Sequence, residues 1–241
     1  MTEQSNKVKF SRVIIKLSGE ALACENGFGI DPQKVDFVCK QIVDVRKMGV
    51  DVGIVIGAGN FWRGRQADDS MNRTTADHMG MLATVMNALA IQDRLEQQNV
   101  PVRVQTALTI ERIAEPYILR RAVRHFEKGR IVIFACGTGN PYFSTDTGAA
   151  LRACEIGADA LLLAKNVDGV YDSDPKVNPD AKKFDKLNYM QVISLGLKAM
   201  DTTAITMCMD NDMPIIAFSL MEKDSIKRAV CGENIGTYIG K

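Results

Sequence analysis

Short apolar runs alternate with stretches of helical periodicity along most of this chain. The runs have strand length and carry apolar residues at consecutive positions, which is typical of strands buried on both faces. They lie at residues 13–17, 52–56, 102–105, 131–135, 160–164, 214–218 and 237–239. Helices are expected at about 32–48, 75–98, 118–127, from about 145, at 189–195 and 199–211, and through Ala229. The alternation predicts the α/β class, an open, mainly parallel sheet sandwiched between helices, in one domain over residues 1–241.

Residues 131–146, IVIFACGTGNPYFSTD, form the most informative stretch. An apolar strand stops at Gly137 and Gly139, and Ser144, Thr145 and Asp146 are good helix-capping residues. A strand, a glycine turn and a helix start therefore follow one another. Such a junction presents backbone N–H groups and hydroxyls, and it binds anions, above all phosphate. Taken alone, an ordinary connecting loop explains the stretch equally well.

Three further strand ends carry similar chemistry. Lys16 stands before Ser-Gly, residues 57–60 read Gly-Ala-Gly-Asn with Arg63 and Arg65 nearby, and residues 166–174 hold Asn and Asp. Parallel strands place their ligands at the carboxyl edge of the sheet. The sequence therefore predicts a polyphosphate site with more than one phosphorylated ligand, although a strand-end lysine that simply reaches solvent remains an alternative for Lys16.

Common nucleotide-binding signatures are absent. Trp62 stands where a dinucleotide fingerprint needs its third glycine, and the segment after it resembles a loop more than a helix. The Walker pattern and the H-R-D and D-F-G motifs of protein kinases are missing as well. A phosphotransferase with this sequence must use a different phosphate cradle.

Composition excludes several function classes. The 30 basic and 29 acidic residues nearly balance, which gives no sign of a nucleic-acid or membrane-surface binder. The polar start of the chain and the lack of any run of membrane-spanning length lead us to expect a cytoplasmic protein. The six cysteines lack C-x-x-C spacing and there are only two histidines, so we expect buried thiols and no Cys/His zinc site.

The long helix expected from about residue 75 has two features of interest. Asp77 is expected in its first turn, where the helix dipole favours a carboxylate, so a purely structural role is one interpretation. Met79, Met81 and Met86 are expected to pack against the protein. The helix has more apolar surface than one sheet face needs, which predicts burial against another subunit.

Five motifs together resemble one known family. They are K-L-S-G-E-A at 16–21, G-A-G-N-x-x-R-G at 57–64, M-N-R-x-x-A-D-H-M-G-M-L-A-T-V-M-N at 71–87, G-T-G-N-P-Y-F-S-T-D at 137–146 and V-D-G-V-Y-x-x-D-P at 167–175. In this order and spacing the chain resembles the bacterial uridylate (UMP) kinases of the amino acid kinase family over essentially its whole length. The resemblance implies the three-layer αβα fold of that family.

The resemblance also implies an activity. It is transfer of a phosphoryl group from ATP to UMP with Mg²⁺, giving ADP and UDP in pyrimidine nucleotide biosynthesis, by a homohexamer that GTP activates and UTP inhibits. The N-terminal part would mainly hold UMP and residues 160–241 mainly ATP. ATP contacts are implied for Lys16, Leu17, Ser18, Gly19, Ala58, Arg63, Asn166, Tyr171 and Asp174. UMP contacts are implied for Gly57, Asp77, Thr138, Gly139, Asn140, Pro141, Tyr142, Phe143, Ser144 and Thr145.

Two positions depart from the family pattern. Ala58 replaces the middle glycine of the usual triplet, and Lys165-Asn166 differs from a threonine-bearing form. The first bears on how closely the backbone approaches phosphate, and the second on the adenosine contact.

The residues fit this chemistry independently of the resemblance. A monophosphate attacks with an oxygen that is already ionised near neutral pH, so no histidine, cysteine or serine catalyst is needed. Lys16 and Arg63 supply positive charge, and Asp146 and Asp201 are candidates to orient Lys16 or the magnesium shell, with no protein ligand to the metal expected. Asp201 also precedes a helix, and an N-cap is the favoured alternative for it.

Two rival functions remain open. Acetylglutamate, aspartate and carbamate kinases share the fold, but the N-P-Y-F-S-T-D and D-H-M-G segments argue against them. A nucleotide-binding regulatory or storage protein without turnover is the rival from another class, and it is disfavoured because Lys16, Asp146 and Asp201 occur together.

Overall fold

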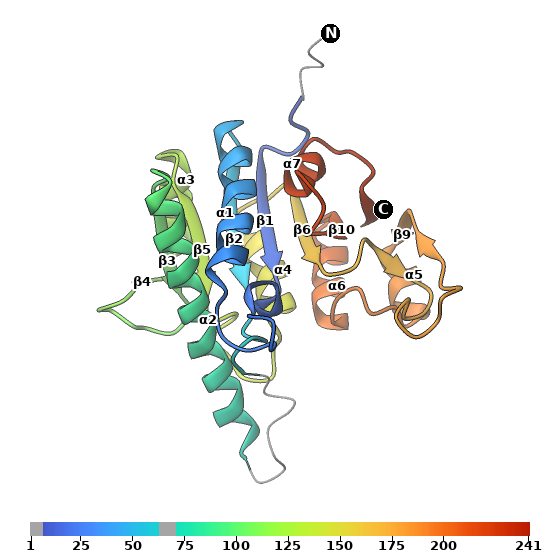
Figure 1. Cartoon of the computed structure of the whole chain (residues 1–241), viewed down its shortest axis with the longest axis horizontal. Helices are drawn as coiled ribbons and strands as arrows, with labels where there is room; N and C mark the ends of the chain where they lie inside the picture. The colour runs from blue at the N-terminus through green and yellow to red at the C-terminus, as the bar shows by residue number, and fades with distance from the viewer. Residues whose placement is uncertain (1–6, 63–70) are drawn as a thin grey trace.

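The computed structural model describes residues 7–62 and 71–241, and it is built around a nine-stranded sheet (Figure 1). The strand order is β4-β3-β5-β2-β1-β6-β10-β11-β9, and every pair is parallel except β10 with β11. The strands are β1 (Arg12–Leu17), β2 (Asp51–Ile56), β3 (Val102–Thr106), β4 (Glu115–Pro116), β5 (Ile131–Ala135), β6 (Ala160–Lys165), β9 (Lys186–Asn188), β10 (Ile215–Ser219) and β11 (Gly236–Gly240). A separate hairpin pairs β7 (Val170–Tyr171) with β8 (Lys183–Phe184).

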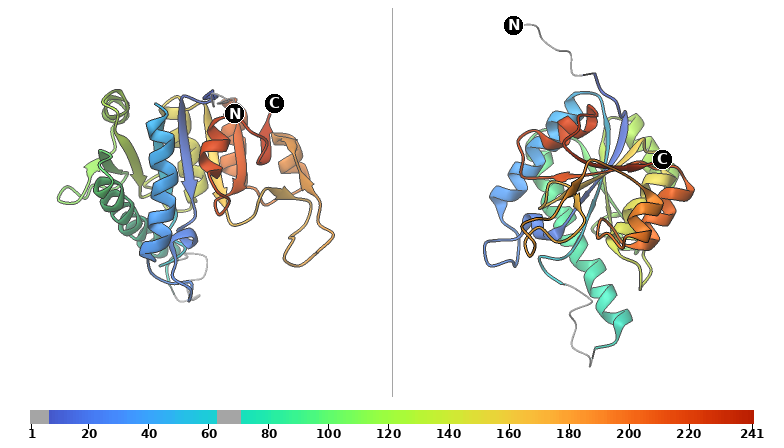
Figure 2. Two further views of the ribbon diagram at one scale, coloured as in Figure 1. Left: turned by 45° about the horizontal axis from the view of Figure 1, so that its top comes forward. Right: turned by 90° about the vertical axis from the view of Figure 1, so that its right-hand side faces the viewer.

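Helices cover both faces of this sheet (Figure 2). One face holds α1 (Pro32–Lys47), α2 (Arg73–Gln97) and α7 (Ser225–Val230). The other holds α3 (Leu119–Glu127), α4 (Thr145–Glu155), α5 (Tyr189–Ser194) and α6 (Thr202–Asp210). A 3₁₀ turn, η1 (Gly19–Leu22), follows β1. The predicted three-layer α/β architecture is confirmed.

β1 shows why consecutive apolar residues were informative. Val13, Ile15 and Leu17 pack into the core on the α1 side, whereas Ile14 packs into the core on the α4 side. Successive side chains of a strand point to opposite faces, so a strand needs apolar residues at consecutive positions wherever helices cover it on both sides. Among the described residues no helix is long and apolar enough to cross a membrane.

The expected helix starts are partly confirmed. Asp31 caps α1 with Pro32 in the first position, and Ser144 caps α4 by accepting from the backbone N–H groups of the next turn. α2 begins earlier than predicted, at Arg73, because Asn72 is its N-cap. The prediction that Asp77 lies in the first turn is therefore wrong, since Asp77 falls in the second turn.

Short elements and some side chains differ from expectation. The polar segment at 176–188, predicted to be a surface excursion, contributes β8 and adds β9 to the edge of the main sheet beside β11. All six cysteines are free thiols, but only three are buried, and the other three are partly exposed. Met81 packs in the core as predicted, whereas Met79 and Met86 are exposed.

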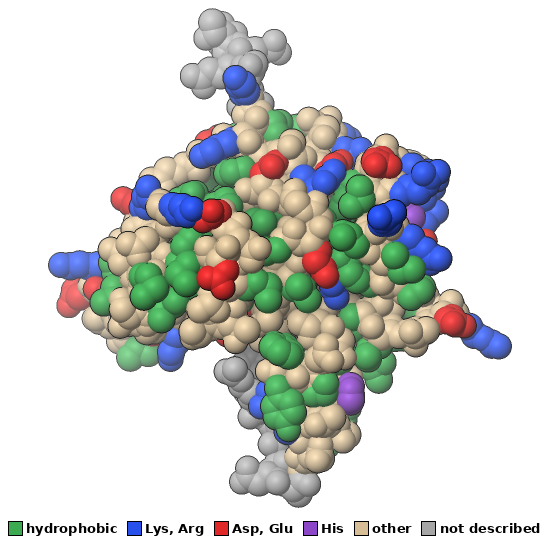
Figure 3. Space-filling model, turned by 180° about the vertical axis from the view of Figure 1, so that it is seen from behind, with side chains coloured by type: hydrophobic (Ala, Val, Ile, Leu, Met, Phe, Trp, Pro, Cys, Tyr) green, Lys and Arg blue, Asp and Glu red, His purple; other side chains and the backbone are tan. Residues whose placement is uncertain are grey.

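The N-terminal part of α2 extends beyond the edge of the sheet in both Figure 1 and Figure 2. Figure 3 shows hydrophobic side chains on this extension. The exposed large apolar residues of α2 are Met79, Leu82, Met86 and Leu89, which recur at the three- and four-residue spacing of one helical face.

Candidate functional site

A cleft of about 970 Å³ opens at the carboxyl ends of the central strands. It is bordered by the ends of β1, β2 and β6, the loop after β5, the start of α4, part of α2, and the segment from α5 to α6. The predicted site residues that line it are Lys16, Ser18, Gly19, Gly57, Ala58, Asp77, Thr138, Asn140, Tyr142, Phe143, Ser144, Thr145, Asp146 and Asp201. Residues from distant parts of the sequence meet because parallel strands end at the same edge of the sheet.

The turns after β1 and β2 touch one another. A Cβ atom on Gly19 would lie 2.5 Å from Asn60 Oδ1 and 2.6 Å from both the Gly57 carbonyl oxygen and the Gly59 nitrogen. No other residue fits at position 19 without moving backbone atoms. Glycine at this position thus allows the two turns to close into one continuous rim.

A buried amide pair holds the second turn. Asn87 of α2 donates to the carbonyl oxygen of Gly57 at 2.8 Å and to Asn60 Oδ1 at 2.8 Å, and Asn60 donates to the Gly29 carbonyl oxygen at 2.8 Å. Asn60 is 1% exposed and Asn87 fully buried. Sequence analysis did not identify this pair, although both residues lie in the motifs quoted above. The sequence did carry a sign of it, because Asn87 is a polar residue on the apolar face of a helix and Asn60 directly follows a glycine turn.

Lys16 and Asp146, which both line the cleft, form an ion pair with 2.6 Å between Nζ and Oδ1. β1 supplies the lysine, and the first turn of α4 supplies the carboxylate, where the helix dipole favours it. The pair fixes an ammonium group at the edge where the backbone N–H groups of the glycine turns are also available. This arrangement suits an anionic ligand.

Asp201 is the N-cap of α6, which confirms the capping role favoured from the sequence, and its carboxylate also contacts α4. Its carboxylate accepts from the Ala204 N–H at 2.9 Å, from the Thr147 hydroxyl at 3.1 Å and from the Ser144 hydroxyl. Ser144 is itself the N-cap of α4. Asp201 therefore fixes the starts of α4 and α6 relative to each other at the cleft.

The turn after β5 has an unusual backbone. Cys136, Gly137, Gly139 and Tyr142 all have positive φ angles, between 55° and 80°. Two of these residues are not glycine, and such strain persists only where the surroundings enforce it. For Cys136, the buried hydroxyl of Thr84 in α2 accepts from its N–H at 2.8 Å, another contact that sequence analysis did not find.

Asp77 enforces the conformation of Tyr142. Its Oδ2 accepts from the Tyr142 N–H at 2.8 Å, and both oxygens lie 2.9 Å from Nε of Arg73. The Arg73 guanidinium also lies 5.6 Å from the centre of the Tyr142 ring. Asp77 thus connects α2 to the turn after β5, a role that the sequence did not indicate.

Lys165, the last residue of β6, is a second lysine of the cleft. Its Nζ donates to the carbonyl oxygens of Ala199 at 2.6 Å and Lys198 at 3.2 Å. Burial lowers the pKa of this ammonium group from its usual value, while the nearby Asp146 carboxylate opposes that shift and Lys16 adds to it.

Not every predicted residue lines the cleft. Arg63 and Arg65 lie outside the described residues. Leu17 is buried in the core, and Gly139 and Pro141 belong to the turn after β5 without lining the cavity. The residues predicted at the adenosine end, Asn166, Tyr171 and Asp174, do not line it either.

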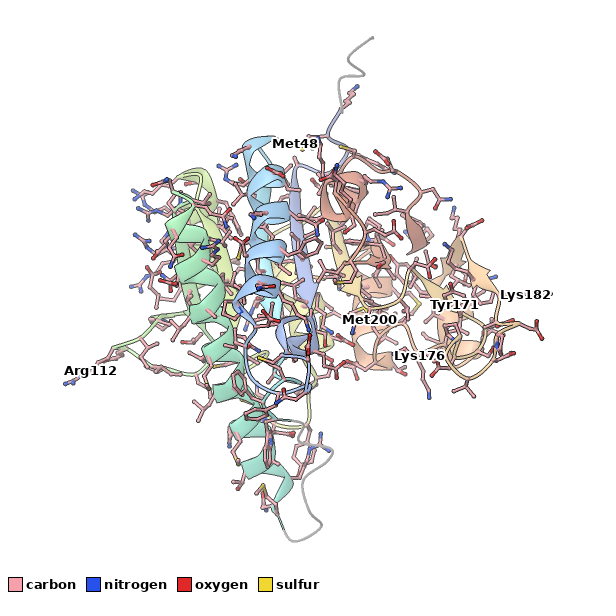
Figure 4. All side chains as sticks on the ribbon, viewed as in Figure 1. Met48, Arg112, Tyr171, Lys176, Lys182 and Met200 are labelled. Carbon is pink, nitrogen blue, oxygen red and sulfur yellow. The ribbon has the colours of Figure 1, made fainter. Side chains whose placement is uncertain are left out.

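Tyr171 and Asp174 bond within their own segment. The Tyr171 hydroxyl donates to Asp168 at 2.6 Å, and Asp174 accepts from the Lys176 N–H at 2.9 Å. Figure 4 shows Tyr171 and Lys176 to one side of Met200, which lines the cleft. Tyr171 and Asp174 therefore lie outside the residues that line the cleft.

Comparison with known proteins agrees with this architecture. The model of the amino acid kinase family matches residues 11–219. The chain belongs to the amino acid kinase family. It is 40% identical to a UMP kinase from Bacillus anthracis, with a TM-score of 0.93 over 96% of each chain. A UMP kinase from Ureaplasma parvum is 36% identical, with a TM-score of 0.91 over 96% of this chain and 99% of that one.

A more distant relative has the same fold. The uridylate kinase from Archaeoglobus fulgidus is 26% identical, with a TM-score of 0.73 over 95% of this chain and 99% of that one. Family membership and these matches identify the chain as a kinase enzyme.

Proposed function

We propose that this kinase transfers the γ-phosphoryl group of ATP to UMP, giving ADP and UDP. The observation that carries the proposal is the Lys16–Asp146 ion pair in a cleft of about 970 Å³ that is bordered by two glycine turns. Two relatives that share more than a third of their residues with this chain are UMP kinases. The same reaction is what the five sequence motifs imply.

In this mechanism the acceptor brings its own nucleophile. An ionised phosphate oxygen of UMP attacks the γ-phosphorus of ATP while the bond from that phosphorus to the β–γ bridging oxygen breaks, and ADP leaves. The protein aligns the two nucleotides and stabilises charge on the transferring group. Lys16, held by Asp146, provides a cation for this charge, and the N–H groups of the turns provide further donors.

Different groups of residues are assigned to the two nucleotides. Gly57, Asp77 and residues 138–145 hold UMP, and Lys16, the turn after β1, Ala58 and Arg63 hold the phosphates of ATP. Asn166, Tyr171 and Asp174 border its nucleoside. The chain is thus one domain whose N-terminal part mainly serves UMP and whose residues 160–241 mainly serve ATP.

Magnesium fits this site as a companion of ATP. The described residues contain no group of three or more histidine, cysteine, aspartate or glutamate side chains that could hold a metal ion. Mg²⁺ commonly binds through substrate phosphates and keeps several of its waters, so it would arrive with ATP, and Asp146 and Asp201 would orient the shell around it. When bound, the ion supplies neutralisation of phosphate charge.

Regulation and assembly are further parts of the proposal. The apolar face of α2 formed by Met79, Leu82, Met86 and Leu89 supports self-association, and a homohexamer is the assembly expected from the family resemblance. Activation by GTP, inhibition by UTP, a cytoplasmic location and a place in pyrimidine nucleotide biosynthesis rest on that resemblance alone.

The test is release of ADP, measured by a coupled assay with UMP, CMP, AMP, acetylglutamate and carbamate as acceptors. Turnover with UMP well above the other acceptors is expected. Preference for acetylglutamate or carbamate would assign the chain to another activity of the family. Nucleotide binding without turnover for any acceptor would support a regulatory or storage role.

A further inference from the structure

Lys165 lies on the same side of the sheet as the Lys16–Asp146 pair. In the parallel register of β1 and β6, Lys16 lies beside Leu163, and Lys165 is two residues further along the strand. Residues two apart in a strand share a face, so Lys16, Leu163 and Lys165 share one. Leu163 packs in the core beneath α4, the helix that carries Asp146. Both lysines therefore reach the cleft from the α4 side of the sheet.

The hydrogen bonds of Lys165 leave part of its ammonium group available. An ammonium group has three N–H donors, and two of them are used by the carbonyl oxygens of Lys198 and Ala199. Within residues 7–62 and 71–241 no carboxylate forms an ion pair with Lys165, and the nearby Asp146 carboxylate pairs with Lys16 at 2.6 Å. Lys165 thus carries a partly buried positive charge that is held in place by neutral carbonyl groups.

An anion in the cleft would compensate this charge. A buried cation without a charged partner is unfavourable, and burial indeed lowers the pKa of the Lys165 ammonium group. A phosphate group can accept the remaining N–H and supply the missing opposite charge. The carbonyl groups meanwhile hold Nζ in position, so that little side-chain entropy is lost when the phosphate binds.

We propose that Lys165 is a second phosphate-binding cation, which donates to the β- or γ-phosphate of ATP beside Lys16. The inference rests on the proposed function, since it takes ATP as the ligand. The alternative is a purely structural role, in which Lys165 only holds the segment before Asp201 against the end of β6 through its two hydrogen bonds. Loss of a structural role would weaken the binding of every ligand of the cleft to the same degree. Loss of a phosphate contact would weaken only the binding of ligands that have a phosphate at that place.

The test compares ATP with AMP, which lacks the β- and γ-phosphates. Calorimetry in magnesium buffer without UMP gives dissociation constants for the wild type, Lys165→Met, Lys165→Arg and Lys186→Met. Lys186 lies in β9, outside the cleft, and serves as the matched control. Lys165→Met should weaken ATP binding about tenfold to a hundredfold, the usual range for a lost charged hydrogen bond, and change AMP binding less than about twofold.

The other variants complete the comparison. Lys165→Arg should recover most of the affinity for ATP because it keeps the charge, and Lys186→Met should match the wild type. If Lys165→Met does not fold, Lys165→Gln replaces it, since its amide can still bond a carbonyl group but carries no charge. Equal losses for ATP and AMP, or no loss for ATP, would overturn the inference and leave the proposed function intact. A wild type that binds ATP no more tightly than AMP would overturn both.

Discussion

Replacement of Asp77 by asparagine tests how the turn after β5 is held. The carboxylate of Asp77 accepts from the Tyr142 N–H and from Nε of Arg73, and its side chain is only 13% exposed. An asparagine side chain is uncharged and has one acceptor oxygen and one NH₂ group. Its NH₂ group would therefore face either the Tyr142 N–H or Nε of Arg73, both of which are donors. We therefore expect Asp77→Asn to loosen the strained turn at Tyr142.

The size of the effect follows from the two contacts. Arg73 is 41% exposed, so solvent screens its share to roughly 1 kcal/mol or less. The bond from the Tyr142 N–H to a charged acceptor is worth about 1.5–3 kcal/mol. If UMP binds against the turn as proposed, its apparent affinity should fall about tenfold to a hundredfold.

The assay is steady-state kinetics at saturating ATP, with UMP and dUMP, for the wild type, Asp77→Asn and Arg73→Gln. Arg73→Gln keeps the carboxylate and should raise the KM for UMP only a few-fold, in line with the weak exposed pair. A KM for UMP within about twofold of wild type in Asp77→Asn would refute the role of this contact, because a lost charged hydrogen bond exceeds that change.

The comparison with dUMP separates a second role. A carboxylate that also accepts from the ribose hydroxyls discriminates against dUMP, because the missing hydroxyl leaves it unpaired. The preference for UMP over dUMP should then shrink in Asp77→Asn. An undiminished preference with a raised KM would leave Asp77 as the residue that fixes the turn and place ribose recognition elsewhere.

Five further outcomes are expected. Lys16→Ala should lower kcat by a factor of about 10² to 10³ in a folded protein, because it removes charge stabilisation during transfer; unchanged turnover would refute the role of Lys16 in the proposed reaction. Asp146→Asn should lower kcat while UMP binding is largely kept. Asn87→Leu should lower the free energy of unfolding in urea by about 2–4 kcal/mol, since it leaves the Gly57 carbonyl oxygen and Asn60 Oδ1 without their donor. A loss below about 1 kcal/mol would contradict this. Light scattering at micromolar concentration should show an oligomer that Leu82→Glu with Met86→Glu dissociates; a monomeric wild type would refute self-association. For Asp159, burial raises the pKa, but hydrogen bonds from Arg12 and Ser11 outweigh this effect and hold the pKa below its usual value. The ionised carboxylate therefore stabilises the fold above the unfolded pKa of about 4, and this stabilisation is lost as the pH falls. Asp159→Asn should lower the Tm at pH 7 but hardly at pH 3.

The architecture could be predicted because burial dictates local sequence. β1 and β5 are covered on both faces, so residues 13–15 and 17 of β1 and every residue of β5 are apolar. Asp31 and Ser144 are ordinary capping residues, and they mark the starts of α1 and α4. β4, β7 and β8, of two residues each, and β9, of three, gave no signal. Elements of that length are too short for periodicity, and their pairing depends on backbone groups of distant segments.

The site was predictable where it depends on turn chemistry. Glycines at 19, 57 and 137 mark turns at strand ends, and the Lys16–Asp146 pair joins two such ends. What the sequence could not give is the set of residues that fix these turns from outside. Thr84 and Asn87 occupy positions on α2 that look like ordinary polar substitutions until the partner turns are seen in three dimensions.

These residues give α2 two different faces within one stretch of helix. Thr84 and Asn87, three residues apart, point inward and hold the turns after β5 and β2, whereas Leu82 and Met86, four residues apart, are exposed and form the proposed contact with another subunit. A helix that moves as a rigid unit would carry any displacement of the outer face to both turns. The Leu82→Glu, Met86→Glu double variant tests whether subunit assembly affects the two turns. If the oligomer dissociates and the KM for UMP is unchanged, the inner hydrogen bonds hold the turns without help from a neighbouring subunit. Dissociation with a raised KM, in a variant that retains the wild-type Tm, would instead mean that assembly fixes the position of α2 and through it the geometry of the cleft.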